Sequence, residues 1–321
     1  MTEQNEKKKC DLVIIGAGPA GFAAGIYAGR SGLDTVLLDM MGGGGQVNII
    51  DRVENYPGVP DIDSGAQLAD LMRKQAEKFG VTVTFDQAER LEPGEDSVTV
   101  HCSGTSYEAR AVLIASGSRH KPLGVPGEGK LMGKGVSVCA TCDGPFFKGK
   151  KVAVVGGGSS AVMEALYLTN VVDHVTLIHR RDKLRAEKIL QDRFLAAPNQ
   201  NVLWDTVVEE ILGEDQVTGL RVKNLKTGES SVLDVAAVFI FVGLLPNSDF
   251  ARGVVDVDDW GFIKVDMDMR TSHPRIFAAG DVRIRSARQI GTAVGDGITA
   301  AVKIQEMLDT ETPKREFEKS A

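Results

Sequence analysis

An internal duplication constrains the fold of this 321-residue chain more than any other feature of its sequence. Residues 12–39 read LVIIGAGPAGFAAGIYAGRSGLDTVLLD, and residues 152–179 read VAVVGGGSSAVMEALYLTNVVDHVTLIH. In each copy an apolar, β-branched run leads into a glycine-rich turn, a helix of small and apolar residues, and a second strand. This order predicts the same β-α-β unit twice, and therefore an α/β chain with two Rossmann-type modules.

The first copy carries a complete dinucleotide fingerprint, G-x-G-x-x-G, directly after its strand. The first glycine makes the turn, the second lets the backbone approach a pyrophosphate, and the third lets helix and strand pack closely. An acid at the end of the second strand, about 20 residues on, can hold a ribose hydroxyl. A tight turn in an unrelated α/β protein is the alternative, and the fingerprint alone does not separate FAD from NAD. The candidate residues are Gly16, Gly18, Pro19, Ala20, Gly21 and Asp39.

The second copy differs from the first at the end of its second strand. Where the first copy has an acid, the second has His179-Arg180-Arg181, followed by Arg185. Arginines at this position attract a 2′-phosphate and can grip it with two hydrogen bonds. A solvated basic patch is the alternative, but the duplication places the cluster where the nucleotide is selected. We therefore expect NADPH here and FAD at the first site. The turn contributes Gly156, Gly158, Ser159, Ser160 and Ala161.

A C-x-x-C motif precedes the second fingerprint by about a dozen residues. Such a pair is either half of a zinc site or a redox dithiol. No second C-x-x-C or paired histidine lies nearby, so the sequence predicts a redox disulfide between Cys139 and Cys142 and no metal site. Asp143 follows directly and can supply a proton to a leaving thiolate. The other two cysteines, Cys10 and Cys102, are expected to be inert core thiols.

The order of these motifs along the chain predicts one domain inserted in another. Alternating runs at residues 81–114 and 202–242 read as β-rich lobes, one for each module. Gly117–Pro122 and Gly243–Asn247 are the candidate boundaries. We therefore expect an FAD-binding domain at residues 1–119 and 248–321, and an NADPH-binding domain with the cysteine pair at 120–247. Each would be a three-layer ββα module.

Composition and charge restrict the location and the partners of the chain. The formal net charge of −7 argues against a nucleic-acid partner. No apolar run reaches the roughly 18 residues of a membrane span, and the charged N-terminus lacks the core of a signal peptide. We therefore expect a cytoplasmic protein without a membrane partner. Residues 2–9 are read as a solvated arm and residues 313–321 as a loose tail.

Together these motifs resemble the low-molecular-weight thioredoxin reductases over essentially the full length of the chain. Further matching segments are 54–58 (ENYPG), 179–186 (HRRDKLRA), Gly280-Asp281 and Arg288-Gln289. The resemblance implies a homodimeric NADPH-dependent flavoenzyme whose protein substrate is thioredoxin. Hydride would pass from NADPH to FAD and then to the disulfide. The resemblance also assigns Cys142 as the thiol that faces the flavin and Cys139 as the thiol that attacks thioredoxin. It assigns Asp143 as the acid that supplies a proton to a leaving thiolate.

The resemblance also extends the FAD site and exposes four departures from the family pattern. It places near FAD the residues Gln46, Asn55, Gly117, Gly280, Asp281, Arg288 and Gln289. Ser159 stands where the family often has Asp or Asn, Met163 where it often has Glu, and Leu244 where a polar residue is common. Residues 40–45 are unusually rich in glycine. These departures bear on the nicotinamide side and leave the dithiol intact.

Three other readings compete with a thioredoxin reductase. A dithiol oxidase of the same fold would pass electrons from a small dithiol to oxygen and would not need the arginine cluster. A redox-sensing or scaffold flavoprotein would bind a partner without turnover. A glutathione-reductase-like enzyme would carry C-x4-C after the first nucleotide unit, and residues 40–60 contain no cysteine.

The chain order further predicts rotation of one module against the other. The dithiol and the NADPH fingerprint belong to one module and the flavin to the other, yet both must reach the same flavin ring. Groups fixed on one rigid body cannot easily alternate there. The two boundary segments are the expected hinges.

Overall fold

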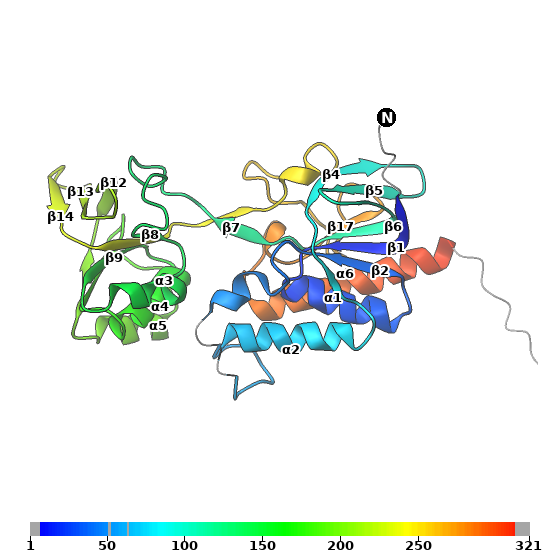
Figure 1. Cartoon of the computed structure of the whole chain (residues 1–321), viewed down its shortest axis with the longest axis horizontal. Helices are drawn as coiled ribbons and strands as arrows, with labels where there is room; N and C mark the ends of the chain where they lie inside the picture. Colours follow the sequence, from blue (N-terminus) through cyan, green and yellow to red (C-terminus); the bar gives the residue numbers. More distant parts are fainter. Residues whose placement is uncertain (1–6, 51–52, 63, 312–321) are drawn as a thin grey trace, which may run out of the picture. The chain divides into compact units, whose positions relative to one another are not determined.

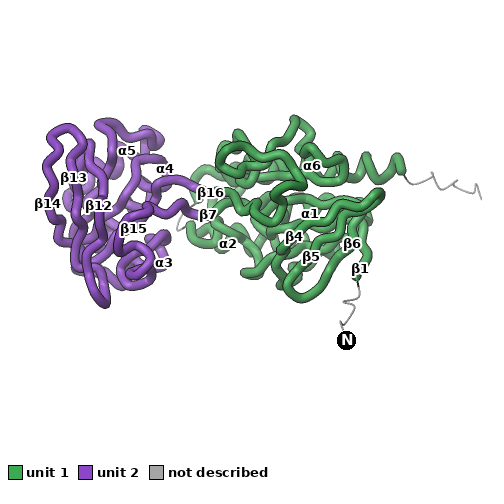
Figure 2. Tube along the Cα trace, turned by 90° about the horizontal axis from the view of Figure 1, so that it is seen from above, with its two compact units in different colours: residues 1–119, 245–321 green, residues 120–244 purple. Residues whose placement is uncertain are grey.

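The computed structural model describes residues 7–50, 53–62 and 64–311, and the chain divides into two compact units (Figure 2). Unit 1 comprises Met1–Arg119 with Leu245–Ala321, and unit 2 comprises His120–Leu244. The chain crosses between the units after residues 119 and 244, and the sequence predicted domain boundaries after residues 119 and 247. Of the predicted arm only residues 7–9 are described, and two of them already belong to the first strand; the tail at 313–321 lies outside the described residues.

Unit 1 is built on a parallel sheet in the order β3-β2-β1-β6, with β17 also on β6. Its strands are β1 (Lys8–Ile15), β2 (Thr35–Leu38), β3 (Val83–Thr84), β4 (Ala88–Pro93), β5 (Val98–Cys102), β6 (Ser106–Ile114) and β17 (Ile276–Ala278). Its helices include α1 (Pro19–Arg30), α2 (Gly65–Glu77) and α6 (Ile290–Glu311), with short 3-10 turns η1 (Gly45–Ile49), η3 (Asp249–Ala251) and η4 (Gly280–Val282).

Both faces of this sheet are buried, which explains the unbroken apolar run in β1. Helices α1, α2 and α6 lie on one side of the sheet, and β4 and β5 on the other (Figure 1). Leu12 and Ile14 pack in the cluster with the helices, whereas Val13 and Ile15 pack in the cluster with β4 and β5. Successive side chains of a strand alternate between faces, so a strand covered on both sides needs apolar residues throughout. Strands β4 and β5 join the sheet antiparallel, through β6.

Unit 2 repeats this layering. Its strands are β8 (Val136–Ser137), β9 (Lys151–Gly156), β10 (His174–Ile178), β11 (Gln200–Leu203), β12 (Thr206–Leu212), β13 (Gly219–Asn224), β14 (Ser230–Leu233) and β15 (Ala237–Phe241). Its helices include α3 (Ala140–Asp143), α4 (Ser159–Thr169) and α5 (Lys188–Leu195), with the 3-10 turn η2 (Gly144–Phe147). The parallel sheet runs β11-β10-β9-β15-β8, and β12-β13-β14 form an antiparallel sheet.

The two faces of the second parallel sheet are covered in the same way as those of the first. Val152 and Val154 pack in the cluster that includes α4, and Ala153 and Val155 pack in the cluster that includes β12 and β13. The predicted α/β class with two Rossmann-type sheets is therefore confirmed. Among the described residues, no helix combines the length and the apolar character that a membrane span requires.

The β-rich lobes predicted at residues 81–114 and 202–242 include strands that belong to the parallel sheets instead. Of residues 81–85 only β3 is a strand, and it forms the edge of the parallel sheet. In unit 2, β11 and β15 also belong to the parallel sheet, and β15 lies between β9 and β8. Every residue of β15 is buried, as a strand covered on both faces requires, whereas β12 and β13 include residues that are partly or fully exposed. The antiparallel layer of unit 2 is thus confined to residues 206–233.

The two crossings between the units run side by side. Strands β7 (Ser118–His120) and β16 (Leu244–Pro246) form a two-stranded sheet. The Asn247 amide donates to the Gly117 carbonyl over 3.0 Å, and the Lys121 amide donates to the Gly243 carbonyl over 2.9 Å. Gly117 has a φ of +64° and Gly243 a φ of +133°, backbone conformations that favour glycine. The predicted boundary segments are therefore paired with one another.

Candidate active site

The cysteine pair forms a disulfide in unit 2, at the end of β8 and the start of α3. The Cys139 sulfur accepts a hydrogen bond from the Cys142 amide over 3.2 Å, and the Cys139 amide donates to the Ser137 hydroxyl over 3.0 Å. Cys139 is 9% exposed, whereas Cys142 is exposed. An amide that donates to a sulfur stabilises its thiolate. The local backbone therefore favours Cys139 as the thiolate once the disulfide is reduced.

An acid and an exposed aromatic ring follow the disulfide. Asp143 ends α3, and its carboxylate forms no hydrogen bond or ion pair with another described residue. Phe146 is 78% exposed, whereas the next ring, that of Phe147, packs edge-on against Phe239 at 6.2 Å. The redox pair thus lies in sequence beside a carboxylate without a partner among the described residues, and beside an apolar ring that its own unit does not cover.

The remaining cysteines are half-buried free thiols in unit 1. Cys10 lies on β1 and Cys102 on β5. Burial raises the pKa of each thiol to about 12, so both are protonated at neutral pH and are poor nucleophiles. Within the described residues, no three His, Cys, Asp or Glu side chains gather into a metal-binding group.

The first fingerprint forms the turn between β1 and α1. Gly16 has a φ of +105°, and a Cβ there would lie 2.5 Å from the Ala115 carbonyl oxygen. A Cβ at Gly21 would lie 1.9 Å from the Gly16 oxygen, whereas one at Gly18 would meet nothing within 4 Å. Close packing therefore requires glycine at positions 16 and 21, whereas Gly18 leaves open space at the N-terminus of α1. This open turn fits a pyrophosphate.

Asp39 ties the fingerprint turn to the glycine-rich loop at residues 40–45. Its carboxylate accepts hydrogen bonds from the amides of Ala17 at 2.9 Å, Met41 at 2.8 Å and Gly43 at 3.2 Å. The Asn48 side chain donates to the Gly43 carbonyl over 2.7 Å. The acid predicted for a ribose hydroxyl is seen here to organise a loop. Sequence position could not reveal this structural role, because the loop has no side-chain pattern.

Two of the residues expected near FAD come together from distant parts of unit 1. The side-chain amide of Asn55 donates to the side-chain oxygen of Gln289 over 3.1 Å, although the two residues are 234 positions apart in the sequence. The Gln46 side chain donates to the Ser118 carbonyl. Asp281 accepts a hydrogen bond from Ser286, but burial raises the pKa of the Asp281 carboxyl. Three further members lie elsewhere: Gly280 begins η4, Gly117 precedes β7, and Arg288 stacks on Phe262 at 5.4 Å.

A buried ion pair fixes the turn that carries Asp281. Arg283 and Asp296 are joined by hydrogen bonds of 2.6 and 2.8 Å, with side chains 15% and 9% exposed. The Gly280 amide also donates to Asp296, over 3.0 Å. Sequence reasoning missed this pair; the available signal was a single charged residue in the otherwise uncharged first half of α6, between Gly295 and Gly297.

Removing one partner of this ion pair should destabilise unit 1. Asp296→Ala leaves a buried guanidinium and the Gly280 amide without their acceptor, which costs about 3–5 kcal/mol. Urea unfolding of the FAD-loaded protein measures the loss. Asp70→Ala, which removes an acid bonded to Arg73 and Lys74 on the surface of α2, is the matched control and should change the midpoint little. Equal losses in the two variants would contradict the assignment.

The second fingerprint repeats the first in unit 2, between β9 and α4. A Cβ at Gly156 would lie 2.5 Å from the Phe241 carbonyl oxygen, whereas one at Gly158 would meet nothing within 4 Å. The Arg185 amide donates to the Gly157 carbonyl over 2.7 Å, and the Ser159 hydroxyl accepts from the Glu187 amide over 3.2 Å. Ser160 and Ala161 continue into α4. The segment after β10 is therefore fastened to the turn.

The basic cluster divides into a buried histidine and exposed arginines. The His179 ring is 5% exposed, covers Gly157 and bonds to the Lys183 carbonyl at 3.1 Å. Burial lowers the pKa of His179, so the ring supports the turn as a neutral group. Arg180, Arg181 and Arg185 are exposed, and none forms an ion pair with another described residue. Their guanidinium donors are therefore available to a phosphate.

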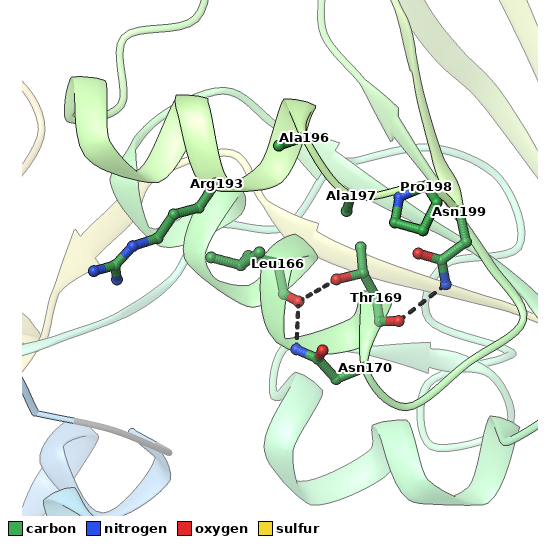
Figure 3. Close-up of a pocket in the computed structure, with 8 residues that line it drawn as sticks. All are labelled: Leu166, Thr169, Asn170, Arg193, Ala196, Ala197, Pro198 and Asn199. Atoms are coloured by element: carbon green, nitrogen blue, oxygen red, sulfur yellow. Dashed lines mark hydrogen bonds between the residues drawn. The ribbon is translucent and has the colours of Figure 1, made fainter.

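A groove of about 570 Å³ lies elsewhere in unit 2, at the C-terminal ends of α4 and α5 (Figure 3). The side-chain amide of Asn199 donates to the Thr169 carbonyl over 2.9 Å, and the side-chain amide of Asn170 donates to the Leu166 carbonyl over 3.3 Å. The fingerprint turn lies at the opposite end of α4. The groove is therefore separate from the nucleotide turn, and its amide groups hold the local backbone.

Comparison with known proteins decides the family. Residues 10–297 match the family model described as pyridine nucleotide-disulphide oxidoreductase. The chain belongs to the pyridine nucleotide-disulphide oxidoreductase family. Membership implies a flavin and a nicotinamide cofactor, with the disulfide as the redox centre that the chain itself supplies.

Similar members of the family are thioredoxin reductases. The chain is 45% identical to that of Listeria monocytogenes over 306 residues, covering 95% of this chain and 96% of the relative. The crystal structure of the Lactococcus lactis enzyme gives a TM-score of 0.92 at 41% identity, covering 94% and 99% of the two chains. That of T. acidophilum gives 0.90 at 36% identity, covering 95% and 100%. The resemblance seen in the motifs is thereby confirmed.

Proposed function

We propose that this oxidoreductase is a thioredoxin-disulfide reductase that takes its electrons from NADPH and uses FAD. The observation that carries the proposal is the Cys139–Cys142 disulfide, in the same unit as a nucleotide turn fastened to an arginine cluster. A donor with a 2′-phosphate would give those exposed arginines a function, because their guanidinium groups can grip a phosphate with two hydrogen bonds. The names of the similar proteins supply the class of substrate.

The residues of unit 1 fit a bound FAD. The open turn at Gly18 would receive the pyrophosphate, Asp39 would hold a ribose hydroxyl, and the 280–289 segment with Asn55 would complete the site. Open backbone at the N-terminus of α1 supports this assignment. A bound flavin supplies two-electron chemistry between a nicotinamide and a disulfide.

Thiol–disulfide exchange by the reduced pair completes the reaction. The Cys139 thiolate attacks one sulfur of the thioredoxin disulfide, and the other sulfur leaves as a thiolate. Cys142 then attacks the Cys139 sulfur of the mixed disulfide. This step reforms the Cys139–Cys142 bond and releases thioredoxin as a dithiol. Asp143 supplies a proton to a leaving thiolate. The exposed ring of Phe146 suits a protein partner, because apolar anchors dominate protein interfaces.

The assembly and location follow from similarity to the thioredoxin reductases. We propose a homodimer in the cytoplasm, without nucleic-acid or membrane partners. The acidic net charge of −7 supports the absence of a nucleic-acid partner. Light scattering during size-exclusion chromatography tests the dimer, and a monomeric mass would refute it.

Turnover requires the two units to rotate against each other. The dithiol and the nucleotide turn both belong to unit 2, whereas the flavin residues belong to unit 1. Each must work at the same flavin ring, and two groups on one body reach it by movement of that body. The glycines of the paired crossings, Gly117 and Gly243, can absorb the change of backbone angles.

A cross-link between the units should therefore stop turnover. We expect a short bifunctional reagent to abolish thioredoxin reduction while one half-reaction survives, either flavin reduction by NADPH or flavin reoxidation by the disulfide. Anaerobic stopped-flow absorbance resolves the two half-reactions. As a control, the spacer of a cleavable reagent is cut after cross-linking, which leaves both modifications on the protein but no link between the units and should restore turnover. Full turnover by a protein shown to be cross-linked between the units would refute the rotation.

Anaerobic addition of NADPH tests the proposed function against its competitors. A reductase bleaches the flavin absorbance and recovers it when oxidised thioredoxin is added. A dithiol oxidase does not bleach with NADPH, and a redox sensor bleaches but supports no turnover of a partner disulfide. Absence of bleaching by NADPH would overturn the proposal.

A further inference from the structure

A lysine in the turn between β13 and β14 makes ion pairs with two acids. The Lys226 ammonium lies 2.8 Å from a carboxylate oxygen of Asp205 and 3.6 Å from one of Asp182. The turn is well defined, because the Asn224 side chain accepts the amides of Lys226 at 2.9 Å and Thr227 at 3.0 Å. The Asp205 side chain is 17% exposed. Lys226 is thus held over both carboxylates.

Both acids lie at the arginine cluster. Asp182 directly follows Arg181, and the Asp205 amide donates to the Arg181 carbonyl over 3.3 Å. The neighbouring Thr206 amide donates to the His179 carbonyl over 2.9 Å. The backbone therefore fixes two negative charges beside the arginines expected to bind a 2′-phosphate. Left unpaired, these carboxylates would repel a phosphate dianion and offset part of the attraction of the arginines.

We propose that Lys226 is a specificity-determining residue for the 2′-phosphate of NADPH, because it neutralises Asp182 and Asp205 beside Arg180 and Arg181. This inference rests on the proposed function and extends its nucleotide site to a residue about 40 positions further along the chain. The hydrogen bond to Asp205 raises the pKa of Lys226, so its charge persists throughout the working pH range. Lys226 acts through the local field and need not contact the nucleotide.

Binding of two nucleotide fragments tests the inference without enzyme turnover. The probes are 2′,5′-ADP, which carries the 2′-phosphate, and 5′-AMP, which lacks it, measured by calorimetry at low and high salt. Lys226→Gln should weaken 2′,5′-ADP about three- to fivefold at low salt, less at high salt, and leave 5′-AMP unchanged. Lys226→Arg should restore affinity, and adding Asp182→Asn to Lys226→Gln should recover part of it. Lys223→Gln, on β13 and paired with Glu209, is the matched control.

The outcomes separate this inference from the proposed function. If the wild-type protein binds 2′,5′-ADP no better than 5′-AMP, the choice of NADPH is wrong. If it prefers 2′,5′-ADP and Lys226→Gln keeps the full preference, the role of Lys226 is refuted. Equal weakening of both fragments would indicate a structural defect and also refute the role. Lys226→Met keeps an apolar side chain of similar length but removes the charge, so it should weaken 2′,5′-ADP binding as much as Lys226→Gln. Unchanged binding in Lys226→Met would refute the role of the charge.

Discussion

Replacing Cys139 with serine should abolish thioredoxin reduction, by about a thousandfold or more, while NADPH still bleaches the flavin. The variant loses the thiolate that the Cys142 amide stabilises, but it keeps both nucleotide turns. Cys142→Ser should fail at a later step, because Cys139 can attack the partner and no second thiol can release it. A mixed disulfide with thioredoxin on Cys139 should then accumulate. Mass spectrometry of the trapped complex, after cleavage into peptides, identifies the cysteine involved.

The trapping experiment distinguishes two criteria for the nucleophile, because Cys142 is more exposed than Cys139. Exposure alone would choose Cys142 as the nucleophile, whereas the hydrogen bond to sulfur chooses Cys139. Cys102→Ser, which removes a half-buried protonated thiol, is the control and should retain full activity. Efficient trapping of thioredoxin on Cys142 in the Cys139→Ser variant would reverse the two roles.

Replacing Arg180 and Arg181 together with alanine should raise KM for NADPH tenfold or more and leave KM for NADH nearly unchanged. Both guanidinium groups are exposed without a partner among the described residues, so their removal disturbs no internal contact. Steady-state kinetics with each donor and saturating thioredoxin measure the change. NADPH carries a phosphate that NADH lacks, and these arginines are proposed to recognise it.

A surface arginine elsewhere in unit 2 controls for loss of positive charge. Arg221 on β13 is about half exposed and paired with Glu210, and Arg221→Ala should alter neither KM. A wild-type enzyme that already uses NADH as well as NADPH would contradict the assignment. So would an equal rise of both KM values in the double variant.

Features that repeat within a short stretch of sequence were predictable. The duplicated β-α-β units, both fingerprint turns and the C-x-x-C pair depend on residues close together in the chain. The alternation in β1, where Leu12 and Ile14 face the helices and Val13 and Ile15 the other layer, follows from an unbroken apolar run. The contrast between Asp39 and Arg180-Arg181 required only the alignment of the two copies.

Contacts between distant segments were not predictable. The bond from Asn55 to Gln289 spans 234 positions, and nothing local in either segment indicates the other. The pairing of Arg283 with Asp296, and of Lys226 with two acids, depends on turns whose closure only the fold determines. β15 was misassigned because a short apolar run fits an inserted layer and a central parallel strand equally well.

The balance between donor and product tests the central claim most directly. Under argon, the wild-type enzyme is mixed with limiting NADPH and excess oxidised thioredoxin, and thioredoxin thiols are titrated against NADPH consumed. The account predicts one thioredoxin dithiol for each NADPH oxidised, and none with Cys139→Ser. NADPH consumption without thioredoxin thiols, or consumption that appears only when oxygen is admitted, would contradict it.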